Sequence, residues 1–192
     1  MRWLIAVSIT AIEALSLAAY GQSQPDSGTT SSSDSLLPRN AVLPKTVVNR
    51  FFPEVSQEAS TGANLTAVGK PKATRSVIYV NSDSSKKVTI SVDQYVSSSD
   101  ASSAYQEAVQ KSKTVPGFRP VAAQDLAANA FIGSVTQGQE THIGLGVLHG
   151  TLIVGATLAG YDSTPDNVAK LVSLTREQEA AARAAVDRNA HN

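Results

Sequence analysis

The three histidines of this 192-residue chain, at positions 142, 149 and 191, are its best candidates for general-base or metal chemistry. His142 and His149 are seven residues apart in one apolar run that predicts a strand. Because side chains alternate between the two faces of a strand, these imidazoles are expected to point in opposite directions. The chain has no cysteine, which excludes thiolate nucleophiles, cysteine metal sites and disulfides. We therefore expect no metal site and no cofactor.

Serine and carboxylate chemistry find equally little support. No Gly-x-Ser-x-Gly motif is present, and Gly133-Ser134 falls within a predicted strand instead of a strand-to-helix turn. A glycosidase-like pair would draw on Asp93, Asp125 or Glu140, but these positions are typical of solvated charges. The Gly-x-Gly at 144–146 lacks the third glycine and the following helix of a dinucleotide site. The sequence predicts a protein that is not an enzyme.

Three apolar runs punctuated by glycine lie between Phe131 and Gly160, broken at Gln137-Gly138 and His149-Gly150. They predict an antiparallel three-strand meander in which His149-Gly150 is a two-residue loop. Alternation then gives one face six apolar side chains: Ile143, Leu145, Val147, Leu152, Val154 and Ala156. The other face carries His142, Gly144, Gly146, Ile153, Gly155 and Thr157. In this register Gly144 lies opposite Gly155.

Three glycines on one face of a sheet predict that something approaches the backbone closely there. A helix seated tightly on the sheet would explain the pattern, and so would a flat floor for an apolar ligand. Under the second alternative the candidate ligand-binding residues are Gly144, Gly146, Gly155, Ile153 and His142.

The elements that position this meander predict an α+β domain. Helical spacing of apolar residues is found at 44–52, at 101–113 and after Thr164-Pro165. Further strands are expected at 75–80, 87–96 and 118–122, whereas 55–72 predicts a loop with a short strand near 64–68. We expect an antiparallel sheet of five to six strands packed on helices, with the C-terminal helix on or beside the sheet.

Composition changes along the chain predict four segments. Residues 1–21 have the positive start, apolar core and small-residue end of an export signal. Residues 22–35 form a Ser/Thr-rich flexible tether, and 36–174 form a single α+β domain. Thr175 with Gln178 resembles a capping box, so 175–192 is expected to be a helical tail on the surface. These segments predict an exported protein of the cell envelope or extracellular space, held at a membrane only by an uncleaved signal.

Two sets of residues carry a resemblance to a known group of proteins. The run Leu17-Ala18-Ala19-Tyr20-Gly21 resembles the lipobox of bacterial lipoproteins, with tyrosine in place of the lipidated cysteine. A tyrosine phenol cannot form the thioether that links the lipid. Over roughly residues 75–174 the chain resembles small actinobacterial cell-envelope lipoproteins and related extracytoplasmic sensor-like domains. The residues concerned are Asp100-Ala101, Ala104-Tyr105, Pro116-Gly117-Phe118, Asn129-Ala130-Phe131 and Leu158-Ala159-Gly160. The resemblance implies a binding or envelope role and seldom catalysis.

Charge and motifs together limit the choice of partner. Sixteen basic residues balance sixteen acidic ones, so there is no basic excess for nucleic acid or for an anionic membrane surface. The interpretation is a non-enzymatic exported protein that binds an apolar small molecule or lipid, or an envelope protein partner. The alternatives are a structural or antigenic surface protein without a pocket, and a hydrolase of unrecognised type.

Overall fold

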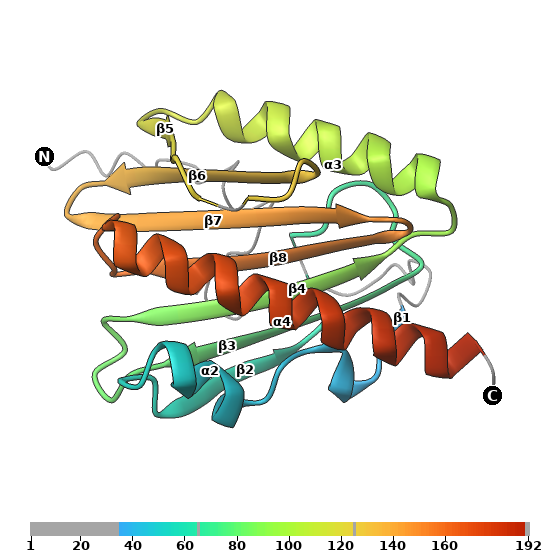
Figure 1. Cartoon of the computed structure of the whole chain (residues 1–192), viewed down its shortest axis with the longest axis horizontal. Helices are drawn as coiled ribbons and strands as arrows, with labels where there is room; N and C mark the ends of the chain where they lie inside the picture. Colours follow the sequence, from blue (N-terminus) through green and yellow to red (C-terminus); the bar gives the residue numbers. More distant parts are fainter. Residues whose placement is uncertain (1–34, 65, 125, 191–192) are drawn as a thin grey trace, which may run out of the picture.

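The computed structural model describes residues 35–64, 66–124 and 126–190 (Figure 1). The expected export signal and nearly all of the expected tether lie outside these residues, as do Asp125 and His191. The strands are β1 (Ser35–Leu36), β2 (Gln57–Gly62), β3 (Ala73–Val80), β4 (Lys87–Gln94), β5 (Phe118–Pro120), β6 (Ala130–Gln137), β7 (Glu140–His149) and β8 (Leu152–Ala159). The helices are α2 (Lys45–Phe51), α3 (Ser98–Lys113) and α4 (Pro165–Ala190), with a short 3₁₀ helix η1 (Arg39–Ala41).

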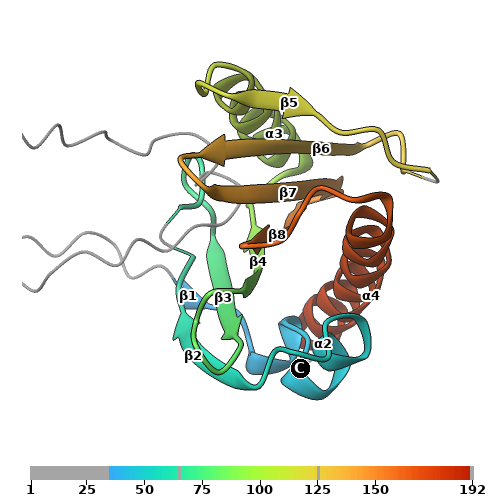
Figure 2. The ribbon, with the colours of Figure 1, turned by 90° about the vertical axis from the view of Figure 1, so that its left-hand side faces the viewer.

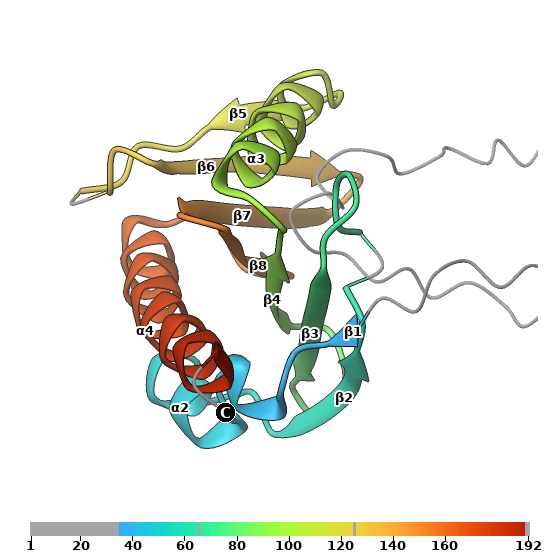
Figure 3. The same ribbon diagram turned by 90° about the vertical axis from the view of Figure 1, so that its right-hand side faces the viewer.

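All the described strands belong to one sheet, in the order β1-β3-β4-β8-β7-β6-β5, with β2 also paired to β3. Seven strands pair antiparallel, and the two-residue β1 pairs parallel with β3. The sheet curls around α4, which lies in its hollow beside α2, while α3 lies outside the curl near β5, β6 and β7 (Figures 2 and 3). Helix α4 packs on β7 and β8.

The α+β class is confirmed, but the expected number of five to six strands is wrong. The sequence analysis missed β1 and β2. Strand β2 has no apolar alternation, because its residues Gln57 to Thr61 are all exposed. It is an edge strand held by backbone pairing to β3, with a register shift between Glu58 and Ser60. Sequence periodicity reports burial, so an exposed edge strand leaves no such signal.

The meander forms, and its two hairpin loops lie one residue later than predicted. The loops are Gly138-Gln139 and Gly150-Thr151. Gly138 and Gly150 both have positive φ, at 62° and 57°. In such two-residue turns glycine takes the first central position, which sets the register. Gly146 therefore lies opposite Gly155, and the predicted pairing of Gly144 with Gly155 is wrong. The shift is two residues along the ladder, so each side chain keeps its predicted face.

Helices begin close to the predicted residues because local capping defines their starts. Ser97 caps α3, its hydroxyl accepting a hydrogen bond from the Asp100 amide at 3.1 Å. Pro165 is the first residue of α4. The predicted break at Thr175 is absent, since α4 runs unbroken from 165 to 190. Gln178 is fully buried there, together with Ala182 and Ala185, so this part of the helix is not a surface tail.

The main hydrophobic core lies between α4 and the hollow side of the sheet. Its sheet residues include the predicted apolar set of the meander, joined by Val88, Ile90 and Val92 of β4. Leu171 and Leu174 of α4 are fully buried against them. Gln178 also fastens the segment before α2: its amide accepts a hydrogen bond from the Leu43 amide at 2.8 Å and donates one to the Ala41 carbonyl at 2.6 Å.

Candidate functional site

The sequence-predicted candidate residues lie together on the outer face of the sheet. His142, Gly144 and Gly146 are on β7, and Ile153 and Gly155 are on the neighbouring β8. All five residues are buried. The register places them on one face, opposite to the face that packs on α4. Ligand binding at these residues stays a prediction.

Helix α3 covers part of this glycine-rich face, which is the first of the two alternatives drawn from the sequence. The Tyr105 hydroxyl donates a hydrogen bond to the Gly146 carbonyl at 3.2 Å. Ile153 packs in a small cluster with Val68 and Tyr95. The buried residues that α3 contributes to that cluster are small, namely Ala101, Ala104 and Ala108, and the partly buried Tyr105 packs against them. Small side chains on the helix and glycines on the strands let the two backbones approach closely.

The glycine row extends into β6, where Gly133 pairs with Gly144. A Cβ at position 133 would lie only 2.2 Å from Cε2 of Phe118. The Phe118 ring is stacked with Phe131 at a centroid distance of 5.8 Å, and the Lys113 amine lies 5.7 Å from the Phe131 centroid. Aromatic side chains therefore fill this end of the row.

His142 lies near the start of β7 and is buried, with 8% of its surface exposed. Its Nδ1 has no hydrogen-bond partner among the described residues, and its Nε2 lies 3.8 Å from Glu140 Oε1. Burial lowers the pKa of His142; Glu140 opposes this effect and Lys87 adds to it. The imidazole therefore favours its neutral form. His149 lies on the opposite face, as predicted, with its Nδ1 2.8 Å from Glu179 Oε1 on α4.

A buried carboxylate, Asp93 of β4, lies on the same outer face beside Ile153. The interpretation of Asp93 as a solvated charge is wrong, because only 4% of it is exposed. The Asn64 amide nitrogen donates hydrogen bonds to both carboxylate oxygens, at 3.0 and 2.9 Å. Burial raises the pKa of Asp93 to about 7, against the opposing effect of Asn64. Asn64 is itself positioned by Thr74, whose hydroxyl accepts a hydrogen bond from the main-chain N–H of Asn64 at 3.0 Å.

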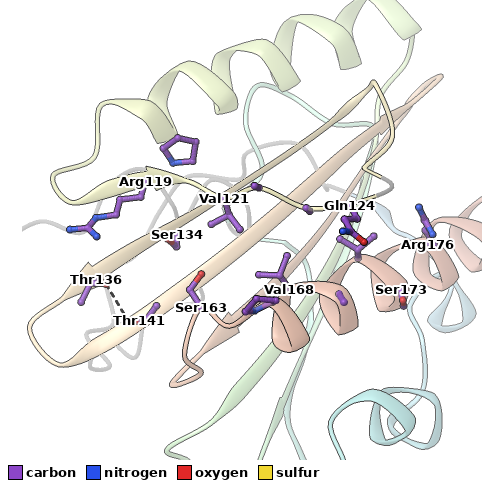
Figure 4. A pocket seen from close by; sticks show the side chains of 16 residues that line it. Arg119, Val121, Gln124, Ser134, Thr136, Thr141, Ser163, Val168, Ser173 and Arg176 are labelled. Atoms are coloured by element: carbon purple, nitrogen blue, oxygen red, sulfur yellow. Dashed lines mark hydrogen bonds between the residues drawn. The ribbon is translucent and has the colours of Figure 1, made fainter.

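A large groove lies on the other face of the sheet, between the start of α4 and the segment that follows β5. This groove, named here the α4–β5 groove, has a volume of about 890 Å³ (Figure 4). Its sixteen lining residues are Arg119 to Gln124, Ser134, Thr136, Thr141, Ser163, Pro165, Val168, Ala169, Val172, Ser173 and Arg176. The volume is that of a small-molecule site.

Polar and apolar side chains are separated along this groove (Figure 4). Val121 and Val168 lie in its middle, and Val168 is almost fully buried. At one end Arg119 lies near a set of hydroxyl side chains, namely Ser134, Thr136, Thr141 and Ser163. At the other end are Gln124, Ser173 and Arg176. The described lining residues include Arg119 and no carboxylate, so this end of the groove favours negative charge.

The residues that line this groove form no sequence motif from which the groove could have been predicted. Arg119 and Val121 belong to a strand of three residues and the loop after it. The groove forms because α4 crosses β7 and β8, while β5 and β6 lie further along the curled sheet (Figure 1). The position of a helix across a curled sheet is a tertiary property that local periodicity does not encode.

No group of three or more His, Asp or Glu side chains is arranged to hold a metal ion in the part of the chain that the structure describes. No helix within the same residues is long and apolar enough to cross a membrane.

Comparison with known proteins gives a likeness at the level of the fold. No protein-family model matches the chain, and no curated protein matches it. Among solved structures, it is similar to the extracellular domain of PknH from Mycobacterium tuberculosis, with a TM-score of 0.51 and 14% sequence identity. The match covers 71% of this chain and 93% of that domain. The chain therefore has the fold of a known extracellular domain, in line with the resemblance to sensor-like domains.

Proposed function

We propose that this protein is a non-enzymatic exported domain that binds a small-molecule ligand in the α4–β5 groove. The groove itself is the observation that carries the proposal: about 890 Å³, with the partly buried Val121 and the buried Val168 in its middle and polar groups at its ends. Such a combination of apolar walls with a few polar groups is typical of small-molecule sites. The described residues of the groove include no paired nucleophile and base, which supports binding over catalysis.

Export is supported by two independent observations. The first 21 residues have the composition of an export signal. The fold is similar to that of an extracellular domain. A domain outside the cytoplasm with an open groove is suited to capturing a ligand of the envelope or of the medium.

A blocked groove tests the proposal. Ala169 is exposed on α4 and lines the groove, so Ala169→Trp should fill it without disturbing the core. Ala180 is exposed on the same helix outside the groove, and Ala180→Trp is the matched control. Native mass spectrometry of protein purified from its own host should show a bound mass in the wild type and in Ala180→Trp, lost in Ala169→Trp.

The two candidate sites lie on opposite faces of the sheet, so one variant for each separates them. Gly144→Val changes the glycine-rich face and leaves the groove intact. If Gly144→Val removes the bound mass and Ala169→Trp does not, the ligand binds at the sequence-predicted site. A bare chain in every sample would contradict ligand binding and favour a structural surface protein. Turnover of an ester or glycoside that a groove variant abolishes would favour a hydrolase.

A further inference from the structure

We infer that the ligand of the α4–β5 groove is an anionic amphiphile, with its negatively charged head group at Arg119 and its apolar body along Val121 and Val168. This inference rests on the proposed function and narrows it to one chemical class. The head group is a carboxylate or a phosphate, since both accept hydrogen bonds from guanidinium and hydroxyl groups.

The charge at Arg119 is available to a ligand. Its side chain is exposed and forms no ion pair with a described residue. No carboxylate lines the groove among the residues that the structure describes. Asp166, the acidic residue in the first turn of α4, is paired with Lys170 at 2.7 Å. A planar guanidinium with several N–H donors suits the two oxygens of a carboxylate or phosphate.

Hydroxyl groups from β6 and β7 line the same end of the groove as Arg119. Ser134 is the Cα partner of Arg119 in the β5–β6 ladder. It is only 8% exposed, it lines the groove, and its side chain forms no hydrogen bond with a described residue. The Thr136 and Thr141 hydroxyls lie 3.2 Å apart, so one of them can donate outward while accepting from the other. The Ser134 hydroxyl lines the groove, so it is available to donate a hydrogen bond to a ligand oxygen.

The start of α4 adds to the same preference. Ser163 and Pro165 line the groove at this end, so the amino terminus of a 26-residue helix borders it. Partial positive charge at a helix amino terminus favours a nearby anion. The apolar body of the ligand then follows Val121, Val168 and Val172 along α4. Burial of the body against these valines supplies affinity, and the head group sets orientation.

Isothermal titration calorimetry at low salt with four probes tests the inference. Dodecanoate, dodecyl phosphate, dodecanol and dodecylamine share one chain and differ in the charge of the head group. Dodecanoate or dodecyl phosphate should bind on the order of tenfold more tightly than dodecanol, and dodecylamine most weakly. Added salt should reduce the difference, because the guanidinium is exposed. The stronger of the two anionic probes identifies the head group.

Three variants test whether Arg119 causes the preference for anionic probes. Arg119→Gln should bring the affinity of the anionic probes close to that of dodecanol. Arg188→Gln, an exposed arginine of α4 outside the groove, is the matched control and should keep the preference. Ser134→Ala should weaken the anionic probes a few fold.

Equal affinity for dodecanol and dodecanoate in the wild type would overturn the anionic assignment while leaving a ligand-binding groove. An anionic preference that survives in Arg119→Gln would also overturn it. If no probe binds, the inference fails, and the native mass spectra of the wild type and Ala169→Trp judge the proposed function separately.

Discussion

The two faces of the sheet are built on different principles. The face toward α4 is filled by branched and aromatic side chains, and the buried residues of the covering helix include Leu171 and Leu174. The face toward α3 carries glycine, serine and threonine, and the buried residues of that helix are alanines and one serine, Ser112. Helix α4 is held on the sheet by packing of large side chains. Helix α3 is held by close approach of its backbone to the sheet.

The buried polar groups of the two faces also have different roles. On the α4 face the buried polar groups serve to position a backbone segment. The Gln178 amide and the Tyr79 hydroxyl both bind main-chain atoms of Leu43. On the α3 face the carboxyl group of Asp93 is buried, and it accepts hydrogen bonds from the side chain of Asn64. The second face should therefore respond to pH through a buried carboxyl group, which the first face lacks among the described residues.

The largest expected effect comes from removing volume on the α4 face. Leu171→Ala leaves a cavity in the core, because Leu171 is fully buried. The free energy of unfolding should fall by about 2–5 kcal/mol. Leu36→Ala is the matched control, since Leu36 is 53% exposed, and it should stay within about 0.5 kcal/mol of the wild type. Urea unfolding measures both. Equal losses would show that α4 is not the main source of stability.

A somewhat smaller loss is expected from the polar group on the same face. Gln178→Ala leaves the Leu43 amide and the Ala41 carbonyl without their partner. The free energy of unfolding should fall by about 2–3 kcal/mol, because buried main-chain groups without partners are costly. Gln139→Ala, in the exposed β6–β7 loop, is the control. Faster hydrogen exchange at the Leu43 amide in Gln178→Ala alone would show that the side chain fastens this segment. Unchanged exchange would contradict it.

Asp93 tests the other face through pH. Its pKa is raised to about 7 in the folded protein, above about 4 for an unfolded aspartate. The folded state holds its proton more strongly, so this contribution to stability is complete below pH 4 and is lost as pH rises toward 7. Asp93→Asn should remove that loss, raising the free energy of unfolding by about 1–2 kcal/mol at pH 8.

Asp83→Asn is the control for this experiment, because Asp83 lies in an exposed turn. Urea titrations at pH 4.5 and pH 8 should show a gain that grows with pH for Asp93→Asn and not for Asp83→Asn. A gain independent of pH would mean that the carboxylate is charged in both states, and that its environment is more polar than its burial suggests.

The sequence predicted the α4 face better than the α3 face, for a physical reason. Alternating apolar residues such as Ile143, Leu145 and Val147 report burial directly, and their face is confirmed. Glycines report a close approach but not what approaches, so the sequence left two alternatives open. The burial of Asp93 was missed because Asn64 contacts it from a segment that has no periodicity.

The register and the groove were beyond prediction for other reasons. The positive φ of Gly150 fixed the hairpin loop one residue later than its sequence suggested. Strand β2 left no signal because its side chains are exposed. The groove depends on how far α4 extends across a curled sheet, and its lining residues Arg119 and Ser134 have ordinary contexts in the sequence. Local patterns thus identified elements and faces, whereas the site arose from their arrangement.

The smallest losses in the free energy of unfolding are expected from removing two tyrosine hydroxyls, one on each face. Tyr79→Phe removes a donor from a buried pair, in which the hydroxyl lies 2.7 Å from the Leu43 carbonyl. Tyr105→Phe removes a donor from the Gly146 carbonyl at 3.2 Å, where the tyrosine is only partly buried. Both variants keep the ring, so urea unfolding isolates the hydroxyl. The losses should be about 1–1.5 kcal/mol at Tyr79 and about 0.5 kcal/mol at Tyr105. A larger loss at Tyr105 would mean that this hydrogen bond holds α3 to the sheet, and that close packing of alanine on glycine contributes less than its geometry suggests.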